Sequence, residues 1–178
     1  MDYVIRKAKL DEREAIERLI AASARHLSLE DYSAAQIEGA IKTVFGVDTD
    51  LILDETYFVA ESSGTLVGCG GWSRRRTLFG GDRFASRDSS ALDPQTEAAK
   101  IRAFFIHPSW ARRGIGRAIL AACESEAQAQ GFRSLELMST LPGLKLYRAC
   151  GYAEEERAEL EVGDGVKIEL ARMRKDLR

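Results

Sequence analysis

The sequence has few of the residues that build metal centres and disulfide frameworks. Its 178 residues include three cysteines and two histidines, and Cys69, Cys123 and Cys150 are far apart in the chain. An odd and scattered set of cysteines predicts reduced thiols in a cytoplasmic protein, with no disulfide framework. We also expect no metal site, since these thiols show no metal-ligand spacing.

Long apolar runs and an excess of one charge are also missing. No run approaches the ~20 apolar residues of a membrane span, and residues 1–14 are charged throughout rather than hydrophobic. The net charge of -2 gives no general attraction to nucleic acid or to an anionic membrane. These absences predict a cytoplasmic protein with no signal peptide, no membrane partner and no nucleic-acid partner.

The remaining composition is that of an ordinary globular domain. Hydrophobic residues make up 45% of the chain and charged residues 30%. A chain of 178 residues is long enough for one domain with a proper core and short for two. We therefore expect a single domain.

A strand, a glycine loop and a helix follow one another over residues 99–131. The apolar run Ile101–Ile106, in which only Arg102 is charged, predicts a strand buried on both faces. An alanine-rich helix follows and ends at Gly131. The glycine loop thus lies at the N-terminus of a helix.

This loop combines glycines with positive charge. Its residues are Arg112, Arg113, Gly114, Ile115, Gly116 and Arg117. A helix N-terminus presents free N–H groups and the positive end of the helix dipole, which together suit a diphosphate. Glycine lets the backbone approach a phosphate closely or take a positive φ. A plain turn without a ligand is the alternative that these residues alone leave open.

Spacing excludes two familiar phosphate-binding loops. The chain contains no G-x-x-x-x-G-K-[ST] string, which a P-loop needs. A dinucleotide fingerprint needs a third glycine three residues after Gly116, where Ile119 stands. The loop therefore belongs to neither class.

The loop resembles instead the [Q/R]-x-x-G-x-[G/A] motif of the Gcn5-related N-acetyltransferase (GNAT) superfamily. Ala111 stands where Gln or Arg is usual. A second segment, Gly143–Tyr152, is similar to the family's A-x-x-[F/L]-Y-x-x-x-G-[F/Y] motif, with Gly143 in place of the usual Ala. The motifs stand in the family's order, and the resemblance extends over residues 3–174, which we expect to form the single domain.

The resemblance implies a mixed α/β fold. It predicts a twisted, mostly antiparallel sheet of six or seven strands, with helices on both faces and with strands four and five splayed apart. Acetyl-CoA would be the co-substrate, with its pantetheine arm between the splayed strands and its diphosphate at the glycine loop. The cofactor-binding residues implied are Phe104, Phe105, Ile106, Arg112, Arg113, Gly114, Ile115, Gly116, Arg117 and Thr140.

The resemblance also implies a reaction. An acetyl group would pass from acetyl-CoA to a primary amine of a small molecule or a protein by direct attack. Tyr147 stands at the position of the family's frequent general acid, and a buried core tyrosine is the alternative interpretation. No base is identifiable, although Glu97 and His107 flank the predicted strand. A non-catalytic acyl-CoA sensor or an interaction module with the same fold is the competing function, and a homodimer stays open.

Other segments give weaker indications. Asp48–Glu55 is expected to be an acidic connector. Gly68, Gly70 and Gly71 in one predicted strand indicate a bulge, close packing against the neighbouring strand, or approach of the backbone to a ligand. Residues 73–98 lack periodicity and predict a long loop. Its basic cluster, Arg74–Arg76, indicates either a solvated surface or attraction for an anion.

Overall fold

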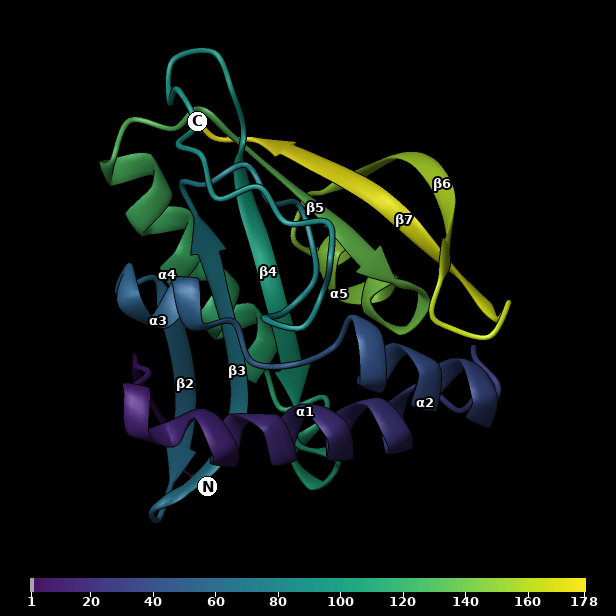
Figure 1. Ribbon diagram of the computed structural model, residues 1–178. Coiled ribbons are helices and arrows are strands. Elements are labelled where there is room, and N and C mark those ends of the chain that lie inside the picture. The colour runs from purple at the N-terminus through teal and green to yellow at the C-terminus, as the bar shows by residue number, and fades with distance from the viewer. Residues whose placement is uncertain (1) are drawn as a thin grey trace.

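Seven strands form one sheet, in the order β1-β2-β3-β4-β5-β7-β6 (Figure 1). The computed structural model describes residues 2–178. The strands are β1 (Val4–Lys7), β2 (Tyr57–Ser62), β3 (Thr65–Ser73), β4 (Ala99–Ile106), β5 (Ser134–Thr140), β6 (Ala153–Glu161) and β7 (Lys167–Asp176). The helices are α1 (Arg13–Leu27), α2 (Ala34–Thr43), α3 (Thr49–Leu53), α4 (Ile115–Ala129) and α5 (Leu144–Ala149).

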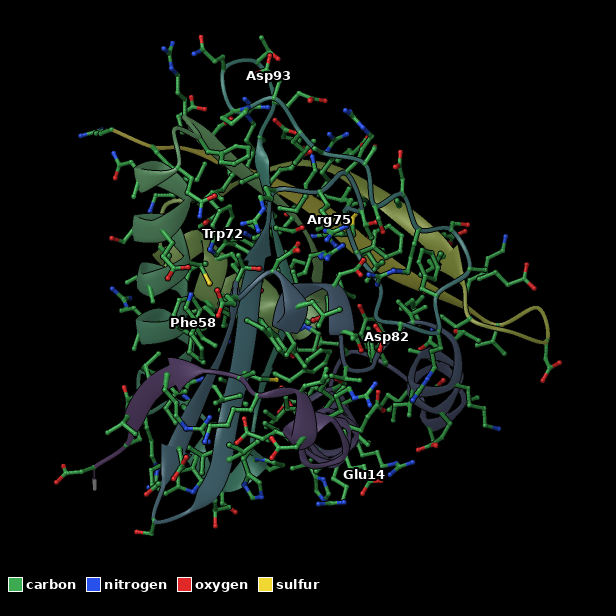
Figure 2. The ribbon with its side chains drawn as sticks, turned by 60° about the vertical axis from the view of Figure 1, so that its left-hand side comes forward. Glu14, Phe58, Trp72, Arg75, Asp82 and Asp93 are labelled. Atoms are coloured by element: carbon green, nitrogen blue, oxygen red, sulfur yellow. The ribbon has the colours of Figure 1, made fainter. Side chains whose placement is uncertain are left out.

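All neighbouring strands are antiparallel except β4 and β5, which are parallel. Helices cover both faces of this sheet, with α1 and α2 on one face and α4 on the other (Figure 1). Figure 2 shows Phe58 and Trp72 pointing toward α4, whereas Arg75 and Asp82 lie on the opposite side of the sheet. The predicted fold class is therefore confirmed.

Periodic apolar residues explain why α1 packs as it does. Ile16, Leu19, Ile20 and Ala24 recur at helical spacing and are at most 4% exposed. Burying an aliphatic side chain of this size contributes about 1.5–3 kcal/mol before the entropic cost of ordering it. The stripe therefore fixes α1 against the sheet.

The start of α2 is set by a capping box at Ser33. The Ser33 hydroxyl accepts a hydrogen bond from the Gln36 amide at 3.2 Å, and the Gln36 side chain accepts one from the Ser33 amide at 2.8 Å. Two amide groups that a helix leaves without partners are satisfied in this way. Ser33 is thus the N-cap of α2.

The expectation of a plain connector over Asp48–Glu55 is wrong, because residues 49–53 form α3. Asp48 is the N-cap, and its carboxylate accepts a hydrogen bond from the Leu51 amide at 3.4 Å. Leu51 and Ile52 of this helix are buried. An acidic N-cap before two apolar residues was the signal for a short helix.

Burial on both faces holds for only the first half of β4. Ala99–Arg102 is buried, whereas residues 103–106 are partly exposed. The reason is that β4 pairs with β5 through Ala99 and Lys100 alone. Beyond that point the two strands have no paired residues, which is the splay expected of strands four and five.

The glycines of β3 allow close packing on both faces of the sheet. A Cβ on Gly68 would lie 2.7 Å from Ile115 of α4, and one on Gly70 would lie 2.6 Å from the Phe104 ring. On the other face, a Cβ on Gly71 would lie 2.8 Å from the Tyr57 ring. These contacts leave no space for side chains, so close packing explains all three glycines.

Candidate functional site

The candidate site is the opening between residues 101–106 of β4 and residues 137–140 of β5. The other edge of β4 pairs with β3, and the other edge of β5 pairs with β7. The edges that face each other lack this pairing after Lys100 and Glu136. An unpaired strand edge offers N–H and C=O groups to an extended ligand.

One backbone group at this opening already has a partner. The amide of Ile106 donates to the hydroxyl of Ser23 on α1 at 3.2 Å. Ser23 is 4% exposed and shares the buried face of α1 with apolar residues. Nothing in the sequence pattern indicates the contact between Ser23 and β4.

The glycine loop follows β4 and begins α4. Gly114 is the N-cap of α4 and has φ of +83°, in the left-handed region that glycine adopts without strain. Arg112 also has a positive φ, of +62°. The guanidinium of Arg113 lies over the Trp110 ring, 4.8 Å from its centroid. The first amide groups of α4 therefore follow a tightly curved and positively charged loop.

Tyr147 of α5 lies beside Phe104 of β4. Its ring makes edge contacts with Phe104 of β4, at 6.2 Å between centroids, and with Tyr152, at 5.8 Å. The side chain is 7% exposed, and its hydroxyl has no hydrogen bond among the described residues. Burial raises the pKa of the Tyr147 hydroxyl well above its usual value. The hydroxyl is therefore protonated across the neutral range and has a free donor.

The neighbour of Tyr147 in the aromatic stack, Tyr152, is held by polar contacts. The Tyr152 hydroxyl donates to Glu124 of α4 at 3.0 Å, and Glu124 also accepts from Lys175 of β7 at 2.9 Å. These bonds tie the tyrosine pair to two elements of the fold. The position of the Tyr147 ring is thus determined by packing on both sides.

Close packing explains why residue 143 is glycine, where the family motif usually has alanine. A Cβ at this position would lie 2.9 Å from the Ser139 hydroxyl and 3.1 Å from the Tyr147 ring. Ser139 is 1% exposed and donates to the Thr140 carbonyl at 2.7 Å. Gly143 therefore makes room for the end of β5, where Thr140 lies, and for Tyr147.

Two carboxylates lie on the α1-facing side of β4, and both are held by cations. Glu136 of β5 bonds to Lys100 and, at 2.6 Å, to Arg172. Burial raises the pKa of Glu136, but the bonds from Lys100 and Arg172 outweigh it and lower that pKa. The second carboxylate is Asp48. Sequence reasoning named neither, because both lie on elements outside the two motifs.

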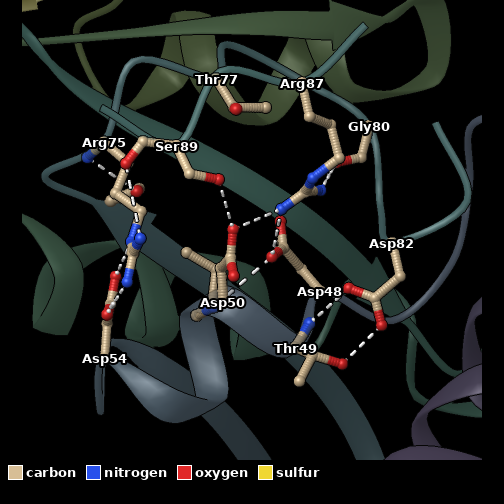
Figure 3. A network of polar contacts seen from close by, with 12 residues as sticks. Asp48, Thr49, Asp50, Asp54, Arg75, Thr77, Gly80, Asp82, Arg87 and Ser89 are labelled. Carbon is tan, nitrogen blue, oxygen red and sulfur yellow. Dashed lines mark hydrogen bonds and ion pairs between the residues drawn. The ribbon is translucent and has the colours of Figure 1, made fainter. Parts of the chain in front are cut away.

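Asp48 is the centre of a buried charge network (Figure 3). Its carboxylate lies 3.1 Å from Arg102 of β4 and 3.1 Å from Arg87, and Arg87 also pairs with Asp50 at 3.0 Å. The Asp48 and Arg102 side chains are 0% and 1% exposed. Burial lowers the pKa of Arg102, and the charge of Asp48 opposes that shift. The network joins α3, β4 and the 74–98 segment.

The ion pair between Arg102 and Asp48 lacks well-aligned hydrogen bonds. Arg102 Nη2 and Asp48 Oδ2 lie at ion-pair distance, yet neither atom has a well-aligned hydrogen bond among the described residues. Arg102 does donate to the Thr77 carbonyl at 3.2 Å. The Arg102–Asp48 contact is therefore mainly Coulombic, and it depends on both charges being present.

The basic cluster Arg74–Arg76 is occupied by acids of the same chain. Arg75 forms two bonds to Asp54, at 2.6 and 2.7 Å, and Arg76 bonds to Glu97 (Figure 3 shows the Arg75 pair). Arg74 lies 3.9 Å from Asp54. Bidentate pairing of this kind anchors the 74–98 segment to α3 and to its own end.

The fold and these motifs agree with comparisons to known proteins. A family model described as the acetyltransferase (GNAT) family matches residues 15–152. The chain belongs to the GNAT acetyltransferase family. A search of curated proteins gives no match.

Solved GNAT structures share this fold at low sequence identity. A GCN5-related N-acetyltransferase from Rhodopseudomonas palustris has a TM-score of 0.74 at 18% identity, over 99% of this chain and 97% of that one. The acetyltransferase YncA from Salmonella typhimurium, solved with acetyl-CoA, has a TM-score of 0.67 at 18% identity, over 100% and 95%. A ribosomal-protein-alanine N-acetyltransferase from Brucella melitensis has a TM-score of 0.64 at 19% identity, over 98% and 99%. At these identities the likeness extends to the fold alone.

Three further features of this GNAT chain concern residues 2–178 only. Among them, no helix is long and apolar enough to cross a membrane. The same residues contain no group of three or more His, Cys, Asp or Glu side chains that could hold a metal ion. All three cysteines are free thiols.

Proposed function

We propose that this GNAT protein is an N-acetyltransferase that transfers the acetyl group of acetyl-CoA to a primary amine by direct attack. The observation that carries the proposal is the β4–β5 opening with the glycine loop directly after β4. An extended pantetheine arm fits unpaired strand edges, and a diphosphate fits the amide groups at a helix N-terminus. The acetyl-CoA in the structure of YncA supports this use of the fold.

We expect the predicted cofactor residues to act at this opening. Phe104, Phe105, Ile106 and Thr140 lie on its two strands. Residues 112–114 precede α4, whereas Ile115, Gly116 and Arg117, expected in the loop, form the first turn of that helix. Ile106 would offer its carbonyl rather than its amide, because Ser23 holds the amide. The residues of the loop would bind the diphosphate chiefly through backbone N–H groups, with Arg112, Arg113 and Arg117 adding positive charge.

Tyr147 is proposed as the acid that assists the departing thiolate. The neutral amine attacks the thioester carbonyl, the C–S bond breaks, and the extra proton on the nitrogen passes to water. The departing sulfur accepts a hydrogen bond or a proton from the phenol, which then regains any lost proton from water. The amine must lose its own proton first, and Asp48 and Glu136 are both engaged by cations. We infer that a water molecule removes this proton.

The acceptor is a small-molecule or peptide amine. The Brucella melitensis neighbour acts on a ribosomal-protein alanine, whereas other members of a fold family can act on different substrates. A screen of polyamines, amino sugars and N-terminal peptides for thiol release from acetyl-CoA tests the proposal. Release above the hydrolysis rate with at least one amine is expected. Binding of acetyl-CoA without release by any amine would favour the non-catalytic sensor.

Gly114 provides a direct test of the diphosphate site. Replacing Gly114 by Val should raise the Kd for acetyl-CoA at least tenfold, as calorimetry would measure. The reason is conformational, since φ is +83° and a Cβ would meet nothing within 4 Å. A β-branched residue leaves the left-handed region, and the loop amides then move away from the diphosphate. Losing one charge-assisted contact is worth roughly 1.5–3 kcal/mol.

Two control variants separate this effect from general strain. Gly165 has φ of +75°, and a Cβ there would also meet nothing within 4 Å, but this glycine lies in the turn between β6 and β7. Gly165→Val should affect stability and leave the Kd unchanged. Gly114→Asn should lose less affinity than Gly114→Val, because Asn tolerates a positive φ. Equal Kd values for Gly114→Val and the natural chain would contradict the proposed loop contact.

A further inference from the structure

Within β4, Ala103 has a backbone conformation that is unusual for its residue type. Its φ is +58°, in the left-handed region that residues with a Cβ avoid. The pairing with β3 shifts at this point, since Cys69 pairs with Phe105 and Gly71 pairs with Arg102. Two residues of β4, Ala103 and Phe104, thus lie opposite the single residue Gly70 of β3. This arrangement is a β-bulge in β4. The bulge lies just after the last pair that β4 makes with β5.

Two buried donors, one from β2 and one from β3, converge on the carbonyl of Ala103. The Tyr57 hydroxyl of β2 donates to it at 3.1 Å, and the Cys69 thiol of β3 lies 3.7 Å from it. Both side chains are 0% exposed. Burial raises the pKa of the Cys69 thiol to about 12 and raises that of Tyr57 as well, so both groups keep their protons. A left-handed residue needs such outside support to persist.

The two glycines next to the bulge make this arrangement possible. The Tyr57 ring reaches β4 from β2 by crossing Gly71, where a Cβ would lie 2.8 Å from the ring. On the other face, the Phe104 ring lies over Gly70. The bulge therefore places Phe104 beside Tyr147 and leaves Phe105 on the opposite face, 5.4 Å from Phe45.

Loss of the bulge would reverse these positions. Side chains alternate along a strand, so a slip of one residue would exchange the faces of Phe104 and Phe105. It would also change which backbone groups of residues 104–106 face the β4–β5 opening. The register of this segment thus depends on what holds Ala103.

We propose that Tyr57 and Cys69 are positioning residues that hold the Ala103 carbonyl and so set the register of residues 104–106 toward acetyl-CoA. The inference rests on the proposed function, since the segment is the one expected to pair with the pantetheine arm. Neither side chain touches the reacting atoms. Their effect passes through the backbone of β4.

Tyr57→Phe tests the proposal because it removes only the hydroxyl. The Kd for acetyl-CoA, measured by calorimetry, should rise about fivefold, the size of effect that a lost buried hydrogen bond commonly produces. Amide hydrogen exchange of residues 103–106 in the ligand-free protein should become faster. Adding Ala103→Gly should restore the Kd to within about twofold, since glycine takes the left-handed conformation without support.

Tyr32→Phe is the matched control. The Tyr32 hydroxyl is also buried and also bonds to backbone, to the Glu169 carbonyl at 2.6 Å and from the Leu141 amide at 3.0 Å, but not to β4. This variant should lower the melting temperature without changing the Kd or the exchange at residues 103–106.

Two results would overturn the inference. One is an unchanged Kd and unchanged exchange in Tyr57→Phe, and the other is no restoration by Ala103→Gly. If the natural chain itself fails to bind acetyl-CoA, the proposed function fails. In that case faster exchange in Tyr57→Phe still shows that the hydroxyl holds the bulge, while the assigned role toward acetyl-CoA falls with the function.

Discussion

Replacing Asp48 by Asn should lower the free energy of unfolding by about 3–5 kcal/mol, the usual cost of leaving one member of a buried ion pair alone. Asn keeps the size of the side chain and can still cap α3, so the variant removes mainly the charge. Arg102, 1% exposed, then loses the one carboxylate that it contacts within residues 2–178, and Arg87 loses one of two. Urea denaturation with an unchanged m-value measures the loss.

Asp50→Asn is the control for this variant. It makes the same chemical change in the same network, but the Asp50 side chain is 30% exposed and pairs with Arg87 alone among the arginines of the network. A partly solvated pair should cost less than ~1 kcal/mol when broken. If both variants lose the same free energy of unfolding, the burial of Asp48 does not account for its contribution to stability.

Replacing Tyr147 by Phe should lower kcat about a hundredfold while acetyl-CoA affinity and melting temperature stay nearly unchanged. General acid catalysis commonly contributes ~10²–10⁴-fold. We expect the low end, because a thiol has a pKa near ~8.5 and its thiolate is already a fair leaving group. Burial raises the pKa of Tyr147, which makes full proton transfer unfavourable and leaves a hydrogen bond to the sulfur as its main contribution. Steady-state kinetics with the best amine from the screen measures it.

Tyr152→Phe controls for loss of a phenol in the same aromatic stack. Its hydroxyl donates to Glu124 of α4, and the family motif itself accepts Phe at this position. We expect kcat to stay within about threefold of the natural chain. A Tyr147→Phe variant that also stays within threefold would show that solvent supplies the proton. A variant that loses stability with no kinetic defect would show that Tyr147 is a core residue.

The sequence predicted the elements whose signals are local. The glycine loop at Gly114 and the helix that follows it to Gly131 depend on residues close to one another in the chain. Burial along β4 was predicted less well, because it depends on where a strand from another part of the chain diverges. Apolar content alone does not distinguish a strand with two neighbours from one that has lost a neighbour.

The site was predictable only where a motif marks it. Tyr147 and the glycine loop follow from two motifs, whereas Tyr57 and Ser23 reach β4 from 46 and 83 residues away in the chain, through contacts that no local pattern encodes. The ion pair of Arg75 with Asp54 could not be predicted from the sequence either, since Asp54 precedes Arg75 by 21 residues. Such pairings are set by tertiary structure rather than by spacing.

The splay of β4 and β5 also leaves the two parts of the sheet with little direct pairing. The sheet consists of β1–β4 on one side and β5–β7 on the other, joined in the backbone at Ala99 and Lys100. The buried Lys100–Glu136 pair and the apolar core against α4 connect the two parts through side chains. A molecule that pairs with both free edges would supply the contacts that a continuous sheet has there. Because such a ligand binds only when both halves are in place, it makes each half depend on the other for its stability. The co-substrate would then complete the fold as well as enter the reaction.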